Sequence, residues 1–114
     1  MAFIFAASSV PGSQLPGTLW DKLVHLVVYG VLGLFFLLPL AGGRLSGVSL
    51  RSCASAVVLA LIYGISDEVH QAFTPDRTPD VMDVVADTVG AAAGVAGVLA
   101  IAFVFRRVRG HRTR

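Results

Sequence analysis

Three long apolar stretches, separated by two short polar ones, dominate the pattern along the chain. Each apolar stretch is longer than the ~20 residues that a helix needs to cross a bilayer. The polar stretches, GGRLSGVSLR and TPDRTPD, contain the Gly and Pro residues that favour turns between helices. The pattern therefore predicts three transmembrane helices, over residues 18–40, 52–73 and 81–105, with Asp80 as the N-cap of the last.

A fourth apolar segment, Phe3–Val10, precedes these helices and is too short to cross a bilayer. We interpret it as the end of a spanning helix whose beginning is missing, or as a partly inserted N-terminal segment. The predicted fold class is all-α: a small polytopic transmembrane helical bundle with three full spans plus a short or truncated N-terminal hydrophobic segment.

Composition supports a membrane location. Only 14% of the 114 residues are charged and 55% are hydrophobic. A soluble domain of this size must keep much of its surface polar, so the composition indicates that the solvent is a bilayer. The single cysteine, Cys53, excludes an internal disulfide. We therefore expect one membrane domain over residues 1–114.

Basic residues gather in the first polar stretch and after the last predicted helix. Arg44 and Arg51 lie in the stretch, and five arginines lie in the tail over residues 106–114. Three spans bring these two places to the same side, which the positive-inside rule makes cytoplasmic. All seven acidic residues then lie towards the outer side, together with Lys22 and Arg77.

Polar residues recur at helical spacing on each predicted span. Asp21, His25 and Tyr29 follow at intervals of four and share one helix face. Near the end of the second span, one face carries Asp67, Glu68 and Gln71. On the third span, acids and glycines form one stripe: Asp83, Asp87, Gly90, Gly94 and Gly97. The small-xxx-small spacing of these glycines indicates close helix packing, so the two acids should face the bundle.

The outer side carries more negative than positive charge. A charge at membrane depth costs at least about 2.5 kcal/mol, and pairing reduces this cost. Arg77 is the strongest predicted partner, because its planar fork can bind two carboxylate oxygens. His25 and His70 are further partners. The excess of acids predicts that some carboxyls are protonated, that the histidines are charged, or that a cation binds.

Two motifs resemble a known family. The first is Asp21-Lys22-x-x-His25-x-x-x-Tyr29, and the second is Asp67-Glu68-x-x-Gln71-x-Phe73 followed by Arg77 and Asp83. Together with Gly90 and Gly94, they resemble the signature of VanZ-like membrane proteins over roughly residues 8–99. One departure is Asp87, which stands where the family commonly has Asn.

The resemblance implies a multi-pass protein of the bacterial cytoplasmic (inner) membrane. The family's namesake is associated with resistance to the lipoglycopeptide teicoplanin, so a role in the cell envelope and in antibiotic susceptibility is implied for this chain. The implied site combines the motif residues: Asp21, Lys22, His25, Tyr29, Asp67, Glu68, Gln71, Arg77 and Asp83, with Asp87 secondary.

Three functions remain open for this site. The leading hypothesis is an outer-face polar pocket that binds a lipid- or wall-related ligand. The first alternative is an enzyme acting on an envelope lipid or wall-precursor headgroup. His25 would be its general base or acid, and Asp67 or Glu68 would orient or share the proton. The second alternative is a structural partner subunit, in which the charges only lock the helices together.

Partners follow from the same observations. We expect membrane lipids, and an envelope precursor or lipoglycopeptide as ligand, but no nucleic acid, because the basic tail suits orientation and anionic lipid. No organic cofactor is predicted. A divalent cation held by His25, His70 and the carboxylates is the metal option, although no compact ligand motif occurs. The sequence leaves the oligomeric state and the metal status open.

Overall fold

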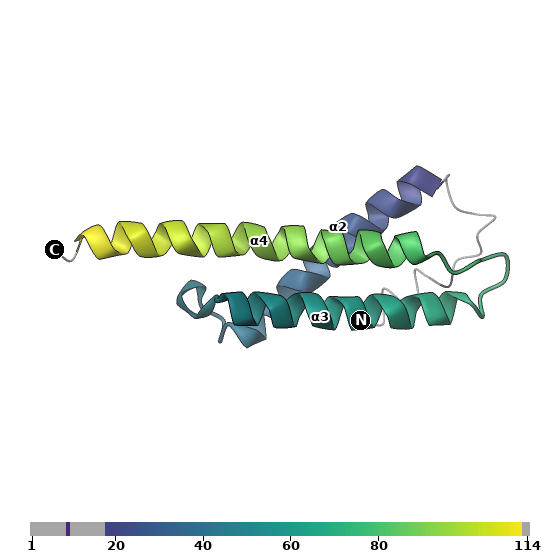
Figure 1. Ribbon diagram of the computed structural model, residues 1–114, viewed down its shortest axis with the longest axis horizontal. Helices are drawn as coiled ribbons and strands as arrows, with labels where there is room; N and C mark the ends of the chain where they lie inside the picture. The colour runs from purple at the N-terminus through teal and green to yellow at the C-terminus, as the bar shows by residue number, and fades with distance from the viewer. Residues whose placement is uncertain (1–8, 10–17, 113–114) are drawn as a thin grey trace.

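The computed structural model describes residue 9 and residues 18–112, and the regular elements among them are all helical (Figure 1). Helix α2 spans Thr18–Leu40, the short 3₁₀ helix η2 spans Leu45–Gly47, α3 spans Leu50–Gln71 and α4 spans Val81–Arg112. The predicted all-α fold class is therefore confirmed. The apolar segment Phe3–Val10 lies outside the described residues except for Ser9.

The helix bounds differ from the prediction at α3 and α4. Helix α3 begins and ends two residues earlier than the predicted range of 52–73. Helix α4 continues beyond residue 105 to Arg112, so the tail predicted from residue 106 is helical as far as Arg112. Arg is a good helix former, and α4 meets no Pro that would stop it, so the helix runs past the apolar residues.

Helices α2, α3 and α4 are long and apolar enough to cross a membrane. Large hydrophobic side chains lie exposed along their outer faces, among them Phe35, Ile62 and Ile101. Water would penalise this exposure, whereas lipid would not. The chain is thus a multi-pass membrane protein. With 32 residues, α4 is about 48 Å long and exceeds the ~30 Å hydrocarbon core.

Local sequence explains where the helices begin and end. After α2, Gly42 and Gly43 take φ values of +63° and +68°, which L-residues with side chains avoid. Ser49 caps α3 through a capping box with Ser52. At α4, the Asp80 carboxylate accepts a hydrogen bond from the backbone N–H of Met82 at 2.8 Å, as expected of an N-cap.

Helices α3 and α4 run antiparallel, and α2 crosses them obliquely (Figure 1). Helix α2 packs mainly on α4, along a seam where backbones nearly touch. A Cβ atom added to Gly94 would lie 2.7 Å from the carbonyl oxygen of Gly30, and one added to Gly90 would collide with the carbonyl oxygen of Leu26. Two of the three predicted packing glycines therefore let α4 approach α2.

Gly97 departs from the predicted glycine stripe. It is exposed, and no atom lies within 4 Å of the position that its Cβ would occupy. At this level of α4, Val95 and Ala102 pack in one buried cluster with Leu37 and Ala41 of α2, so the contact face of α4 no longer includes Gly97. The prediction that Gly97 packs against a neighbouring helix is therefore wrong.

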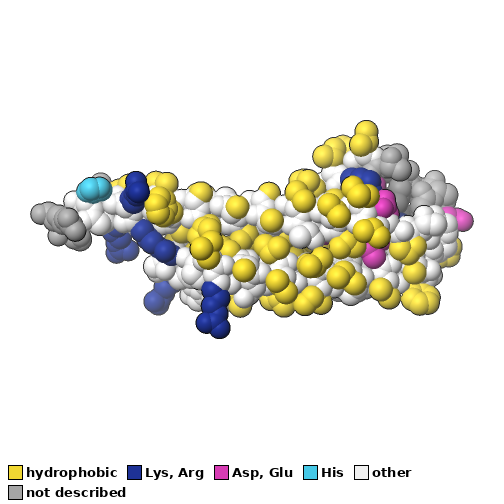
Figure 2. All heavy atoms as spheres, viewed as in Figure 1, with side chains coloured by type: hydrophobic (Ala, Val, Ile, Leu, Met, Phe, Trp, Pro, Cys, Tyr) yellow, Lys and Arg dark blue, Asp and Glu magenta, His cyan; other side chains and the backbone are white. Residues whose placement is uncertain are grey.

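Charges separate to opposite ends of the elongated molecule (Figure 2). Most Lys and Arg side chains visible in this view lie where α4 ends, the Asp and Glu side chains lie where it begins with a basic group beside them, and hydrophobic side chains lie along the face between the two ends. At the basic end, the Arg106 guanidinium donates to the carbonyl oxygens of Leu45, Ser46 and Val48. Arg106 thus fastens the turn between α2 and α3 to α4.

We expect Gly90→Ala to destabilise the protein by about 1–3 kcal/mol, because the new methyl group meets the α2 backbone, which cannot rotate away. Gly97→Ala, the same change on the same helix, should not destabilise the protein, because the methyl group meets no atom and Ala is the better helix former. Thermal unfolding in detergent, followed by circular dichroism, measures both. Equal effects of the two substitutions would contradict the proposed seam.

Candidate functional site

The acidic end of the bundle collects polar side chains from four segments. The first turns of α2, the last turns of α3, the loop 72–80 and the first turns of α4 meet there, because α3 and α4 are antiparallel and α2 begins beside α4. Several of these groups are buried, and we call the following set the polar cluster: Asp21, Lys22, His25, Tyr29, Asp67, Glu68, Gln71, Arg77, Asp80, Asp83 and Asp87.

Lys22 links α2 to the start of α4. Its Nζ donates to Asp80 Oδ2 at 2.7 Å and to Asp83 Oδ1 at 2.8 Å. Asp80 is exposed enough for water to screen the first pair, whereas the Asp83 side chain is buried. The ammonium of Lys22, followed by the N–H of Met82, lowers the pKa of Asp80 below its usual value. Lys22 therefore holds the α4 N-cap in its ionised form.

His25 pairs with Asp87 in the interior of the bundle. His25 Nδ1 lies 2.8 Å from Asp87 Oδ1, and Asp87 is 0% exposed. Asp87 fits there because Gly64 of α3 has no side chain: a Cβ at Gly64 would lie 2.8 Å from Asp87 Oδ2. Asp87 was predicted as a secondary site residue, but it is the direct partner of the imidazole.

Glu68 and Asp67 have other partners than His25. Glu68 Oε2 accepts a hydrogen bond from the backbone N–H of Asp80 at 2.7 Å, which ties α3 to the start of α4. Asp67 Oδ2 accepts from Gln71 Nε2 at 3.3 Å within α3. In place of the expected arrangement, in which Asp67 or Glu68 orients His25, the imidazole Nδ1 is paired with Asp87 Oδ1.

Arg77 makes a weaker contact than the sequence suggested. Its Nη2 lies 3.6 Å from Asp21 Oδ1, beyond hydrogen-bond distance, so the predicted two-pronged contact with a carboxylate is not formed. The Arg77 side chain is nonetheless buried, and its Nη1 has no hydrogen-bond partner among the described residues. The guanidinium therefore retains donors inside the cluster.

Three more buried polar atoms lack a hydrogen-bond partner within the described part of the chain: Tyr29 Oη, Glu68 Oε1 and Asp87 Oδ2. The Tyr29 ring stacks on His25 with an interplanar angle of 4° and is 1% exposed. A buried polar atom without a partner costs about 1–3 kcal/mol. Such atoms are concentrated in the polar cluster, where a polar ligand, an ion or water would satisfy them.

His70 lies outside the polar cluster. Its Nε2 is 3.0 Å from Ser9 Oγ, so it connects α3 to the N-terminal region. Among the described residues, one group could surround a metal ion: Asp21, His25 and Asp83, from each of which one ligand atom lies within 4.8 Å of the other two. His25 was expected in a metal set together with His70 and the carboxylates, and His70 is not part of this group.

An apolar groove lies beside the polar cluster, between the end of α3 and the start of α4. It has a volume of about 490 Å³, and its described lining is Ile65, Glu68, Val69, Ala72, Phe73, Pro79, Val81 and Val84. Glu68 is the one charged residue of this lining and also belongs to the polar cluster. The groove was not predicted, because its walls come from two helices and the loop that joins them.

These features define a small multi-pass membrane protein with a buried cluster of ionisable groups at one end of its spanning helices. The chain belongs to the VanZ/LLP1 family, whose model matches residues 1–105. The family predicted from the sequence motifs is thereby confirmed. No curated protein and no solved structure matches the chain.

We expect Lys22→Met to raise the pKa of Asp80 towards the ordinary value of about 3.9, because the carboxylate loses its ammonium partner. Since the pKa of Asp80 is lowered in the folded protein, the Lys22 interaction stabilises the fold above the ordinary pKa. This contribution is lost as the pH falls through the lowered value. A ¹³C NMR titration of the Asp80 carboxyl measures the shift, and Lys22→Arg, which keeps the charge, is the control. An unchanged pKa in Lys22→Met would contradict this assignment.

Proposed function

We propose that this protein binds an amphiphilic ligand of the cell envelope, a lipid or a lipid-linked wall component, at the acidic end of its helices. The ligand's hydrocarbon part would lie in the groove between α3 and α4, and its polar head would reach the polar cluster. The observation that carries this proposal is the position of Glu68. This residue belongs to the lining of the apolar groove, and its buried Oε1 has no hydrogen-bond partner among the described residues.

The chemistry of the two regions suits an amphiphile. Apart from Glu68, the described walls of the groove are Val, Ile, Phe, Ala and Pro side chains, which offer no polar contact. The adjoining polar cluster holds carboxylate oxygens of Glu68 and Asp87 without a hydrogen-bond partner among the described residues. It also holds the Nη1 donor of Arg77, which is unpaired within the same part of the chain. A headgroup with hydroxyl, amide or amine groups could donate to Glu68 and accept from Arg77. The same binding would alter susceptibility to teicoplanin, a lipoglycopeptide that combines these features.

The orientation completes the proposal. By the positive-inside rule, the arginine-rich end lies on the cytoplasmic side of the bacterial inner membrane, and the polar cluster lies on the outer side. Envelope assembly takes place on that outer side. An outward cluster would therefore meet lipid-linked wall components and external antibiotics, whereas an inward one would not meet the antibiotics.

The second candidate function is an enzyme acting on an envelope lipid. The bond between His25 Nδ1 and the fully buried Asp87 favours it, because a carboxylate that orients an imidazole is a frequent arrangement for a general base. In this case His25 would take a proton from water or from a hydroxyl group of the lipid head.

We expect Val69→Trp to weaken binding of teicoplanin, or of a polyprenyl-linked wall precursor, by at least about tenfold, because the indole would fill the groove. Val58→Trp is the matched control, since Val58 is 52% exposed and Val69 57% exposed on the same helix. Titration of the labelled ligand into each purified variant in nanodiscs measures the affinity directly.

If Val58→Trp weakens binding as much as Val69→Trp does, the groove is not the binding site. If wild-type protein binds neither compound, the binding proposal fails for these ligands. Turnover of the precursor that is lost in His25→Ala would instead identify the enzyme.

Orientation is tested by thiol accessibility in a Cys53→Ser background. We expect Thr78→Cys, in the loop at the acidic end, to react with a membrane-impermeant reagent in intact cells. Ser46→Cys and His111→Cys, at the arginine-rich end, should react only after lysis. Labelling of Ser46→Cys and His111→Cys from opposite sides would refute a three-span arrangement with both sites in the cytoplasm.

A further inference from the structure

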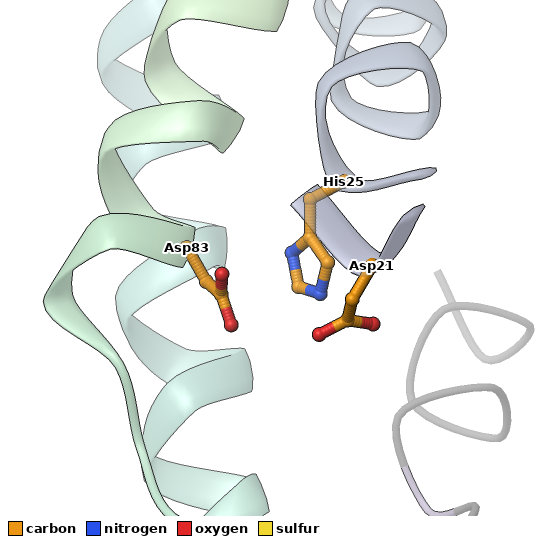
Figure 3. Close-up of side chains that lie close together, drawn as sticks. All are labelled: Asp21, His25 and Asp83. Atoms are coloured by element: carbon orange, nitrogen blue, oxygen red, sulfur yellow. The ribbon is translucent and has the colours of Figure 1, made fainter. Parts of the chain in front are cut away.

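We infer that Asp21, His25 and Asp83 form a binding site for a divalent transition-metal ion of the first row, such as Zn²⁺ or Mn²⁺. Figure 3 shows the imidazole of His25 between the two carboxylates. Asp21 and His25 stand one turn apart on α2, and Asp83 comes from the first turn of α4. The ion would therefore join two helices by three side chains.

The distances suit an ion of this size. One ligand atom from each residue lies within 4.8 Å of the other two. Two ligands about 2.1 Å from a tetrahedral metal are about 3.4 Å apart. The three atoms therefore need to approach one another by up to about 1.4 Å, a movement that rotation of the side chains would have to supply.

The orientation of His25 is a second indication, which does not involve the two carboxylates proposed as ligands. Metal-bound histidines almost always donate their other ring N–H to a carboxylate, which fixes the tautomer. His25 Nδ1 lies 2.8 Å from Asp87 Oδ1, and Asp87 is fully buried. When Asp87 accepts the Nδ1 proton, the lone pair of the neutral ring is on Nε2, the atom left for the metal. Asp87 is thus a positioning residue.

Glu68 provides a third indication. It is 6% exposed, and its Oε1 has no hydrogen-bond partner among the described residues. Its Oε2 is held by the Asp80 N–H, so the carboxylate is fixed beside the site. A proton donor such as a water molecule on the ion would satisfy Glu68 Oε1.

The cations already present leave room for a metal. Six carboxyl groups of the polar cluster face two permanent cations, Lys22 and Arg77. Lys22 contacts Asp83 through Oδ1, which leaves Oδ2, and it keeps Asp80 as a second partner. Arg77 approaches Asp21 only to 3.6 Å. A divalent ion would lower the remaining repulsion among buried acids.

The donor set indicates which ion. One imidazole nitrogen with two carboxylates suits Zn²⁺, Mn²⁺ or Fe²⁺, whereas Mg²⁺ and Ca²⁺ prefer oxygen ligands throughout. Zinc is the probe of choice because it has no redox chemistry. A site built on His25 should therefore retain Zn²⁺ against an excess of Mg²⁺, which an acidic patch alone would not.

The test is equilibrium dialysis of the purified full-length protein against Zn²⁺ in detergent without added lipid, with bound metal measured by mass spectrometry. We expect one Zn²⁺ per chain, not displaced by a hundredfold excess of Mg²⁺. His25→Ala and Asp83→Asn should each lower the affinity by at least about tenfold. Asp76→Asn is the matched control, because Asp76 is an exposed acid and its φ of 59° also suits Asn.

A measurement on the wild-type protein covers the case in which these variants do not fold. In ¹⁵N-histidine NMR spectra, Zn²⁺ should shift the Nε2 resonance of His25 and leave those of His70 and His111 in place. The site is refuted if His25 does not shift, if Mg²⁺ displaces Zn²⁺ at equal concentration, or if Asp76→Asn loses as much affinity as Asp83→Asn. Because no lipid is present, such a failure leaves the proposed amphiphile binding untouched.

Discussion

The cost of an unpaired charge in a medium without water governs this structure. Ionisable groups within apolar helices are tolerated when they meet one another inside the bundle. Lys22 with Asp80 and Asp83, and His25 with Asp87, satisfy this requirement across α2 and α4. All three pairs join residues 58 to 62 positions apart in the chain, so these contacts between polar groups also fix how α2 lies on α4.

Close backbone approach makes these pairs possible. Gly90 and Gly94 let α4 come near the α2 backbone, and Gly64 leaves space for the Asp87 carboxylate against α3. The small residues therefore determine where the charged residues lie. With a larger residue at Gly90, α2 and α4 would separate, and the distance between His25 and Asp87 would increase. Packing in the apolar seam and electrostatics in the polar cluster are thus two parts of one arrangement.

The acidic end combines features that a purely structural network does not need. Ion pairs alone would lock the helices, yet Tyr29, Glu68, Arg77 and Asp87 each keep a buried polar atom without a hydrogen-bond partner in the described residues. An apolar groove reaches the same Glu68. Binding of an amphiphile at the groove and of a metal ion at His25 would occupy neighbouring parts of one site, so each would be expected to influence the other.

The sequence by itself determined the all-α class, the three spans, the family and the set of residues at the acidic end. Length, hydropathy and helical spacing are local properties, and the motif residues can be counted along the chain. Only the tertiary structure decided the partners. In the folded chain, His25 pairs with Asp87 and not with Asp67 or Glu68. Gly97 lies outside the packing seam, and His70 lies beside Ser9. Spacing places residues on a helix face, whereas the crossing of the helices decides which faces meet.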